Sequence, residues 1–513
     1  MRLSRTFLCA VAVTVGFSAP ALTAEPVKGG DLVVAMAVTL PTVDPHASTG
    51  VATRYIASHI FESVVTSGEN GDIIPQLAES YEISEDTKTY TFHLRSGVNF
   101  HNGDVLDAGD VVASWQRMKD QSVDQGVMKL VESFEEVDDH TVVVHMAEPH
   151  PTFLDSLSSP RVIVGIMPEE IAVLPKEQFE AVGTGPYKFV EWVPDSHIKL
   201  ARFEEYTPQT TGKVRDGFGG IRTAYLDTVT FRTVPEAGAQ IAGLLTGDYH
   251  IADQVSPQDV PRLEAAEGVS AQKVLPWYMV HQTFNLTHPV GADENFRKAV
   301  QIGLNYETLM DFATGGNYIL GHGWQYEGFP YYSDVGKDTY NVADMDKAKE
   351  YLAKSSYNGE ELEILTISDE AVLRDYAIAL ADQLGKLGIK TRINAQNAAT
   401  WSELRVKRES WDIIIGGFGL APSIGPFGML AHFSGEGSLQ GVQFPEIEDA
   451  AKRVKTGMTF EIRKKGFEDY QAAVLGKAIS VRAGAAGIYI GVRDEVHNFT
   501  PGRVIRAWDL WLE

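Results

Sequence analysis

Alternating apolar and polar residues near the start of the chain predict a β-hairpin. Residues 89–95 read TYTFHLR, so aromatic and aliphatic side chains alternate with polar ones, which is typical of a strand with one face on a core. Residues 80–83 are a shorter strand candidate, and the polar run at 85–88 supplies the turn between the two. We therefore expect an antiparallel pair of strands here.

A helix with a recognisable start follows this hairpin. Asp107, with Asp110 three residues later, is typical of a helix N-cap with acidic support. Apolar residues then recur at helical spacing and share one face of the predicted helix: Val111, Val112, Trp115 and Met118.

Strand and helix patterns alternate along the rest of the chain, separated by glycine and proline. They predict strands at residues 31–37, 141–146, 187–190, 197–203 and 228–233, and helices at residues 54–65 and 235–245. Residues 362–367, 372–387 and 389–393 form a strand-helix-strand unit with Gly388 as helix C-cap, followed by a helix at 402–408 and a buried strand at 411–415. This alternation indicates an α/β fold.

Several short blocks of this sequence make up a signature. They are Tyr90-Thr91-Phe92-His93-Leu94-Arg95, Gly97-Val98, Phe100-His101, Asn102-Gly103, Asp110-Val111, Ser114-Trp115, Gly183-Thr184-Gly185-Pro186-Tyr187 and Asn295-Phe296-Arg297-Lys298-Ala299-Val300. In these blocks and in their spacing the chain resembles the family 5 extracytoplasmic solute-binding proteins, the peptide, opine and nickel receptors of ATP-driven importers. The resemblance extends over nearly the whole chain.

The resemblance implies an α/β, two-lobed periplasmic binding protein fold (type II, cluster C) with an extra subdomain in the first lobe. By this analogy residues 25–71, 186–277 and 485–513 form the first lobe and residues 72–185 its extra subdomain. Residues 278–484 then form the second lobe. A solute would be enclosed between the lobes, because a ligand that touches both favours the closed form only through contacts that the open form lacks.

The N-terminus has the pattern of a secretory signal. Arg2 and Arg5 precede the apolar run at residues 7–17, and small residues up to Ala24 allow cleavage. We therefore expect residues 1–24 to be a signal peptide and the mature protein to be periplasmic. Cys9 is the only cysteine, so a mature chain without this segment would have no disulfide and no thiolate metal site.

Composition limits the choice of partner. The chain has 44 basic and 69 acidic residues and a formal charge of −25, which argues against nucleic acid or anionic lipid as a partner. With 513 residues of which 44% are hydrophobic, it is long enough to bury more than one core. We expect a monomer that is not inserted into a membrane.

The glycine-rich segment 416–426, GGFGLAPSIGP, is the main candidate for the ligand site. It follows a predicted buried strand, and ligands of open α/β sheets bind beyond the carboxyl ends of strands. Its glycines would let a ligand approach the backbone; alternatively, they serve only a sterically demanding turn. The candidate binding residues in it are Phe418, Gly419, Leu420, Ala421, Pro422 and Ser423.

Ala421 bears on the kind of ligand. By the resemblance, peptide receptors usually carry Asp three positions after a Gly-aromatic pair, where it pairs with the ligand's α-ammonium group. Aligning Gly417-Phe418 with that pair puts Ala421 in the Asp position. A buried ammonium without a counter-charge costs several kcal/mol, so an oligosaccharide, an opine or a similar conjugate is the alternative to the family's default ligand, a peptide.

Aromatic residues near predicted strand ends are further candidates. Trp277, Tyr278, Trp324 and Trp401 have flat faces that pack on sugar rings or hold a cation, although such residues are also common in ordinary cores. His281 is a polar candidate. Because imidazole binds nickel well, a nickel-chelate receptor is a further alternative, but no histidine pair has the helical spacing of a metal motif and we predict no metal site and no cofactor.

The sequence has no GxxxxGK[ST], HExxH or GxSxG motif, which leaves a secreted hydrolase as a remote alternative. The sequence thus predicts a periplasmic binding protein, not an enzyme, that captures a small solute and delivers it to an inner-membrane ABC permease.

Overall fold

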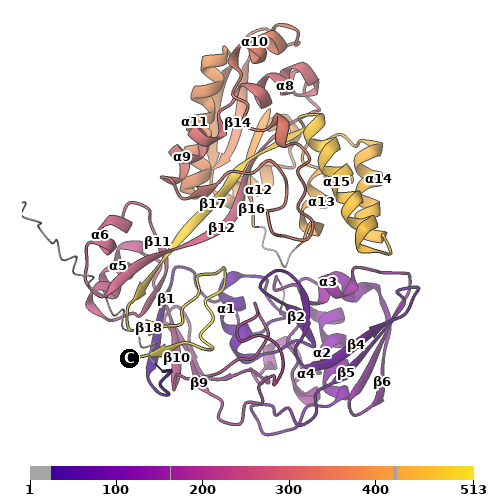
Figure 1. Ribbon diagram of the computed structural model, residues 1–513, viewed down its shortest axis with the longest axis vertical. Helices are drawn as coiled ribbons and strands as arrows, with labels where there is room; N and C mark the ends of the chain where they lie inside the picture. Colours follow the sequence, from indigo (N-terminus) through magenta and orange to yellow (C-terminus); the bar gives the residue numbers. More distant parts are fainter. Residues whose placement is uncertain (1–24, 162, 420–424) are drawn as a thin grey trace, which may run out of the picture.

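The computed structural model describes residues 25–161, 163–419 and 425–513. The predicted signal peptide and the candidate site residues 420–423 therefore lie outside the described residues. In Figure 1 the elements form an upper and a lower group, joined by two long strands that cross diagonally between them. We call the lower group the first lobe and the upper group the second lobe. The predicted two-lobed α/β architecture is confirmed, whereas the exact residue boundaries of the lobes stay a prediction.

One sheet of eleven strands runs through both lobes. Ten of its strands lie in the order β15 (Lys390–Gln396), β14 (Glu361–Ile367), β16 (Ile413–Phe418), β12 (Val269–Phe284), β17 (Ser480–Arg493), β11 (Ile251–Val255), β1 (Asp31–Met36), β10 (Thr228–Thr233), β9 (His197–Arg202) and β8 (Tyr187–Val193), and β13 (Tyr318–Ile319) pairs with β17.

The strands β12 and β17 connect the lobes. They pair antiparallel from Val269 with Arg493 to Thr283 with Ser480. At about 3.3 Å per residue, sixteen residues of β12 extend for about 50 Å, long enough to pass from one lobe into the other (Figure 1). Neither strand was predicted. Burial along β12 is irregular in its first half and complete in its last six residues, so the strand does not maintain a period of two.

The first lobe is built around β1, which pairs parallel with both β10 and β11. The helix α1 (Val51–Ile60) packs its apolar face on the core beneath this sheet. The prediction of a helix over 54–65 was wrong at both ends, because the helix starts after Gly50 and Phe61 already has an extended backbone. The other elements of this lobe outside the subdomain are α5 (Ala237–Thr246), α6 (Val260–Glu264), β2 (Val65–Ser67), β18 (Val496–His497) and β19 (Trp511–Leu512). The strand β2 pairs with β3 (Ile73–Pro75), which lies at the start of the predicted subdomain range.

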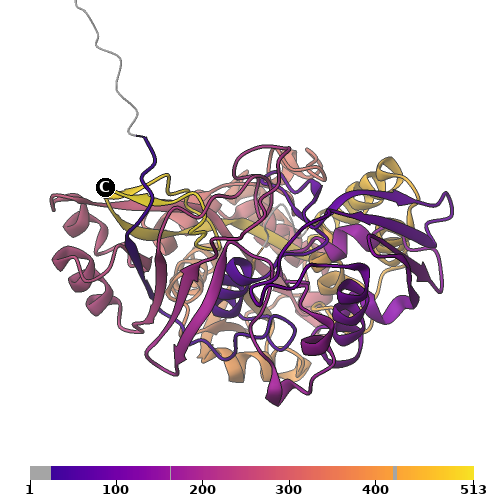
Figure 2. The same ribbon diagram turned by 90° about the horizontal axis from the view of Figure 1, so that it is seen from below.

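A subdomain with its own hydrophobic core forms one end of the first lobe. Its four strands lie in the order β4 (Ala78–Ile83), β5 (Thr89–Leu94), β7 (Thr141–Met146) and β6 (Val131–Asp138), and α2 (Ala108–Gln121), α3 (Phe153–Leu157) and α4 (Glu169–Ala172) accompany them. The predicted hairpin is confirmed, as is the helix start, where Asp107 and Asp110 form a reciprocal capping box. Figure 2 shows this sheet and the helices α5 and α6 at opposite ends of the molecule.

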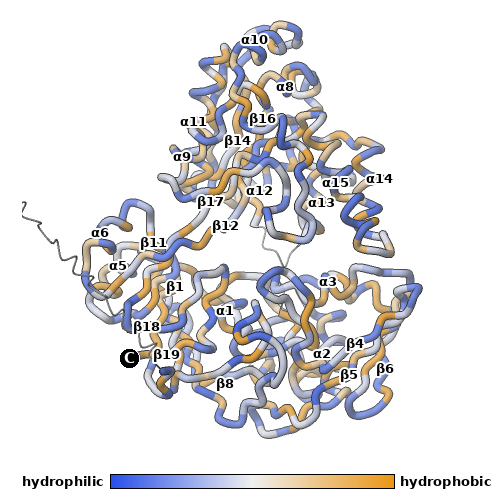
Figure 3. Tube along the Cα trace, in the orientation of Figure 1, coloured by the Kyte–Doolittle hydropathy of each residue, from blue (hydrophilic) through white to orange (hydrophobic). Residues whose placement is uncertain are grey.

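The second lobe contains most of the helices. They are α7 (Pro289–Ala292), α8 (Glu294–Gly303), α9 (Tyr306–Thr314), α10 (Met345–Ala353), α11 (Ala371–Leu387), α12 (Ala398–Leu404), α13 (Phe427–Phe433), α14 (Pro445–Thr456) and α15 (Phe460–Gly476). In Figure 3 apolar residues follow the strands at the centre of this lobe, whereas α14 is mostly polar. Short 3₁₀ helices are η1 (Gly126–Leu130), η2 (Lys176–Gln178), η3 (Lys337–Thr339) and η4 (Arg408–Ser410).

The predicted strand-helix-strand unit of the second lobe is confirmed. Strands β14 and β15 are parallel and α11 connects them, ending at Gly388, whose φ of 93° is the left-handed conformation that glycine tolerates. The next helix was predicted at 402–408 but is α12, which starts earlier because the Asn397 side chain caps it by accepting from the Thr400 N–H. The strand predicted at 411–415 is β16, which starts two residues later and continues through both glycines to Phe418.

A buried histidine links α1 to the C-terminal segment of the chain. His59 Nδ1–H donates to the carbonyl oxygen of Tyr55 at 2.6 Å, and its Nε2 accepts from the Ala507 N–H at 2.8 Å. Both bonds together require a neutral ring. Burial is the main cause that lowers the pKa of His59 from 6.5 to about 3.

We expect this histidine to make the protein acid-sensitive. Below pH 6.5 the unfolded chain binds a proton that the folded chain does not bind until about pH 3, so the stability is complete above pH 6.5 and is lost as the pH falls towards 3. The loss is at most about 1.4 kcal/mol per pKa unit. Urea unfolding of the wild type and His59→Gln at several pH values measures it: their difference in stability should shrink as the pH falls. A difference that stays constant would contradict the assignment.

Candidate functional site

A cavity of about 280 Å³ lies between the two lobes, and both lobes contribute to its lining. We call it the interlobe cavity. The first lobe supplies Thr49, Arg54, Arg161 and Arg503, and the second lobe supplies Gly417, Phe418, Gly419, Gly428, Met429 and His432. Phe418 and Gly419 were predicted site residues, and both line this cavity.

Neighbouring pockets extend the cavity into a longer groove. A pocket of about 440 Å³ shares Arg503 with the cavity, and one of about 420 Å³ shares Arg161 and Gly428 with it. The latter shares Asp155 and Phe427 with a further pocket of about 410 Å³. Because residues of both lobes line each pocket, the series forms one interlobe groove.

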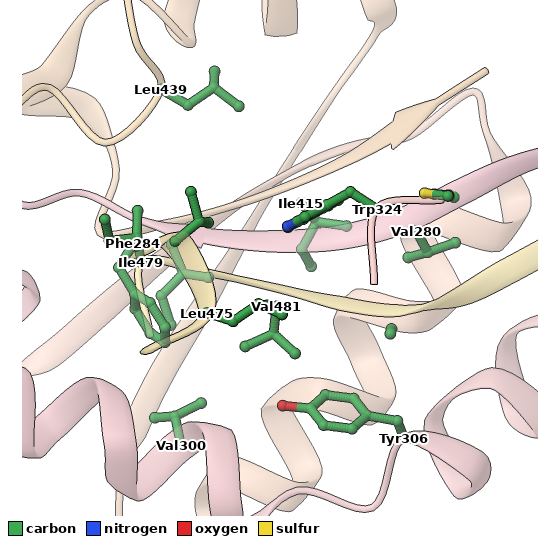
Figure 4. Close-up of a cluster of buried hydrophobic side chains, with 14 of the residues drawn as sticks. Val280, Phe284, Val300, Tyr306, Trp324, Ile415, Leu439, Leu475, Ile479 and Val481 are labelled. Atoms are coloured by element: carbon green, nitrogen blue, oxygen red, sulfur yellow. The ribbon is translucent and has the colours of Figure 1, made fainter. Parts of the chain in front are cut away.

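Phe418 forms the second-lobe wall of the cavity at the end of β16. Its ring stacks on His281 with centroids 4.1 Å apart and an angle of 6°, and the edge contact with His432 has centroids 3.9 Å apart. On the core side, the ring centroid of Trp324 lies 6.2 Å from that of Phe418, and Trp324 has no exposed surface. Figure 4 shows Trp324 beside Ile415 in the core of this lobe. With 8% of its surface exposed, Phe418 belongs to both the core and the cavity lining.

The two glycines before Phe418 allow neighbouring side chains to approach the strand. A Cβ at Gly416 would lie 2.7 Å from His281 Nε2, and a Cβ at Gly417 would lie 2.8 Å from the Tyr278 ring. A ligand-binding loop and a sterically demanding turn were the two predicted roles of these positions, but both glycines belong to a regular strand. Here glycine makes room for side chains from β12.

The two histidines of this wall are neutral. His432 Nδ1–H donates to the carbonyl oxygen of Gly428 at 3.0 Å, and burial is the main cause that lowers the pKa of His432 to about 4. Burial also holds the pKa of His281 well below its usual value, with a smaller contribution from the nearby His432. Neutral rings pack against Phe418, His281 by its face and His432 by an edge contact, without the cost of burying a charge.

Arg503 is the centre of the first-lobe wall. Its guanidinium lies 4.7 Å from the centroid of the Trp277 ring and donates through Nη1 to the carbonyl oxygen of Trp277. A Cβ at Gly419 would lie 2.7 Å from Nη2, so the guanidinium lies close to the second-lobe backbone where the lobes meet. Burial, followed by the charge of Arg54, lowers the pKa of Arg503 to about 10. The group remains charged at neutral pH, held in place by the indole.

Arg54 reaches the same cavity from the first turn of α1. Its Nε is buried and has no hydrogen-bond partner among the described residues. Burial and the charge of Arg161 lower the pKa of Arg54. The helix that carries it has no side-chain N-cap at Gly50 and no acidic residue in its first turn, so its positive end also faces this region uncompensated.

The described candidate residues from the sequence analysis do not all have the same surroundings. Tyr278, His281 and Phe418 come together around the end of β16, and Trp277 supports Arg503. Trp324 lies in the second-lobe core, and Trp401 packs half-buried against Trp411, Leu365 and Ile414. Binding roles for all of these residues stay predictions.

The cavity residues that come from the first lobe and from α13 were not among the predicted site residues. They are Thr49, Arg54, Arg161 and Arg503 from the first lobe and Gly428, Met429 and His432 from α13. A single arginine carries no local pattern, and Arg54, Arg161 and Arg503 come from distant parts of the chain, so only the fold brings them together.

The part of the chain that the structure describes contains no group of three or more His, Cys, Asp or Glu side chains placed to hold a metal ion. None of its helices has the length and apolar character needed to span a bilayer.

Two lobes with a groove between them, crossed by paired strands, define a two-lobed binding protein. A model for bacterial extracellular solute-binding proteins, family 5 Middle, matches residues 72–440. The chain belongs to this family, as its signature blocks predicted, and it is a substrate-binding protein of an ABC importer.

The chain is similar in sequence to curated binding proteins. The chain is 26% identical over 407 residues to the glutathione-binding protein GsiB of Pectobacterium atrosepticum, covering 78% of this chain and 74% of that protein. It is 27% identical over 421 residues to the oligopeptide-binding protein AppA of Bacillus subtilis, covering 76% and 73%. These relatives are binding proteins.

Solved structures share the fold. The ABC transporter substrate-binding protein CtaP of Listeria monocytogenes superposes with a TM-score of 0.82 at 21% identity, covering 94% of this chain and 99% of that one. AgaA of A. tumefaciens R10 in complex with agropinic acid has a TM-score of 0.72 at 23% identity, with coverage of 94% and 99%. The predicted periplasmic binding protein fold is thereby confirmed.

Proposed function

We propose that this protein captures a short peptide in the interlobe groove and delivers it to the inner-membrane permease of its importer. It acts in the periplasm as a monomer after removal of residues 1–24, without making or breaking a bond in the solute. The lobes have the predicted ranges, with residues 25–71, 186–277 and 485–513 in the first, 72–185 as its subdomain and 278–484 in the second.

The observation that carries this proposal is that each wall of the interlobe cavity comes from a different lobe. A solute bound there contacts Arg54 and Arg503 on one side and Phe418 and His432 on the other. Only the closed arrangement offers both sets of contacts, so binding shifts the equilibrium towards closure. A permease that recognises the closed form then receives loaded protein.

The form of the groove and the relatives favour a peptide. The connected pockets suit an extended chain better than a single compact ring system. The named curated relatives bind glutathione or oligopeptides, which favours a peptide over the predicted oligosaccharide, opine and metal-chelate alternatives. For a peptide ligand, Ala421 in place of the expected Asp means that the peptide's ammonium group is held by other residues than in most peptide receptors.

Native mass spectrometry and calorimetry test the proposal. The full chain is expressed with export to a periplasm, and its native mass is compared with its denatured mass to find any copurified solute. The protein is then titrated with glutathione and with peptides of a few residues. We expect one peptide per protein, recovered intact after incubation. Cleavage of the peptide would indicate a hydrolase, and binding only of a non-peptide solute would also overturn the proposal.

A further inference from the structure

Three of the four carboxylates that line the interlobe groove, Asp124, Glu69 and Asp155, have cationic neighbours. Asp124 pairs with Arg161 at 3.6 Å, and Glu69 pairs with Arg506 at 3.1 Å. The charge of Arg463 acts on Asp155, whose pKa is nevertheless raised, mainly by burial. Two further charges of opposite sign, Asp72 and Lys273, line the two outer pockets of the groove. These groups largely balance one another.

Arg54 and Arg503 remain without such a neighbour. No Asp or Glu lines the interlobe cavity, and among the described residues neither arginine has a carboxylate oxygen within 4.0 Å. The segments outside the described residues supply none either, because residues 1–24, 162 and 420–424 contain no Asp or Glu. In a chain of formal charge −25, this cavity is therefore a local excess of positive charge.

The guanidinium groups of Arg54 and Arg503 have hydrogen-bond donors that an anion in the cavity can satisfy. Trp277 fixes Arg503 by stacking and by its carbonyl oxygen, which leaves other N–H groups free to donate towards the cavity. Arg54 has a buried, unpartnered Nε, and the charges of the two arginines disfavour each other. A carboxylate placed between them would relieve this repulsion and satisfy the donors, with bidentate geometry available to each arginine.

We propose that the interlobe cavity binds carboxylate groups through Arg54 and Arg503, and that the solute is an acidic peptide in which carboxylates outnumber ammonium groups. This inference rests on the proposed function and deepens it by naming the charge of the solute. It also fits Ala421, because a site selecting negative charge does not depend on an acidic partner for the ammonium group.

Calorimetric titration with three peptides of equal length tests the inference. The probes are Glu-Ala-Glu, Ala-Ala-Ala and Lys-Ala-Lys. Charged hydrogen bonds contribute about 1.5–3 kcal/mol each, so we expect the acidic peptide to bind about 10- to 100-fold more tightly than the neutral one and the basic peptide to bind most weakly. Equal binding of the three would overturn the inference and leave peptide transport intact. Failure of all peptides would overturn the proposed function as well.

Matched variants locate the effect. Arg54→Gln and Arg503→Gln should each weaken binding of Glu-Ala-Glu about 10-fold or more and change binding of Ala-Ala-Ala much less. Arg262→Gln removes the same charge from the exposed surface of α6 and should leave both affinities unchanged. Because Arg503 also packs on Trp277, Arg54→Gln is the decisive variant if Arg503→Gln lowers the melting temperature. An unchanged preference for the acidic peptide in Arg54→Gln would contradict the assignment.

Discussion

The substitution Phe418→Ala should lower the free energy of unfolding of the second lobe by about 3–5 kcal/mol and weaken solute binding at the same time. Phe418 is only 8% exposed and its ring touches His281 on one face and His432 at an edge. Truncation leaves a void in this aromatic cluster and removes the second-lobe wall of the interlobe cavity. A residue that served the ligand alone would show the loss of binding without the loss of stability.

Denaturant unfolding and calorimetry measure the two effects separately. Phe312→Ala is the matched control, because Phe312 lies in α9 of the same lobe with 60% of its surface exposed, and we expect less than about 1 kcal/mol there. Two lobes need not unfold together, so two probes of unfolding are compared before a free energy is assigned. A stability loss for Phe418→Ala no larger than that of the control would contradict the packing described for Phe418.

The substitution Asp44→Ala should destabilise the protein by about 3–5 kcal/mol, because it leaves the Arg117 guanidinium buried without its partner. The two side chains are 3% and 1% exposed, and Arg117 Nη1 lies 3.0 Å from Asp44 Oδ1. Asp44 follows β1 of the first lobe and Arg117 belongs to α2 of the subdomain. We therefore expect the substitution to weaken the packing of the subdomain against the rest of the first lobe, in addition to removing the ion pair itself.

Thermal and urea unfolding of Asp44→Ala measure this loss, and Asp382→Ala is the control. Asp382 pairs with Lys386 at 2.6 Å on the surface of α11, where both side chains are more than 60% exposed. Such pairs contribute about 0–1 kcal/mol. Similar effects of the two substitutions would show that the Asp44 pair does not hold the subdomain in place.

Local patterns in the sequence correctly predicted the helices and strands that are determined by residues within the element itself. The alternation at 89–95 and the capping pair Asp107 and Asp110 lie within one element each, and the structure has both as expected. Gly388 ends α11 because its left-handed backbone suits glycine. The start of α12 was predicted too late in the chain, because the role of Asn397 as its N-cap was not recognised.

Features that depend on tertiary structure could not be predicted in this way. The strand β12 changes from half-buried to fully buried along its length, and β17 is buried along most of its length, so neither shows the alternation of an ordinary half-buried strand. The interlobe cavity also depends on tertiary structure, since Arg54, Arg161 and Arg503 come from distant parts of the chain. The glycines of β16 were recognised, but the side chains they accommodate, Tyr278 and His281, come from β12.

Hydrogen exchange with and without solute is the most direct test that binding occurs between the lobes. The measurement follows peptides from the first-lobe segment 498–506, which carries Arg503, and from α13 of the second lobe, which carries His432. A solute held in the interlobe cavity should slow exchange in both segments at the same ligand concentration, because it closes the lobes on itself. Slower exchange in one segment only, or in neither while the solute binds, would place the site elsewhere and contradict the account.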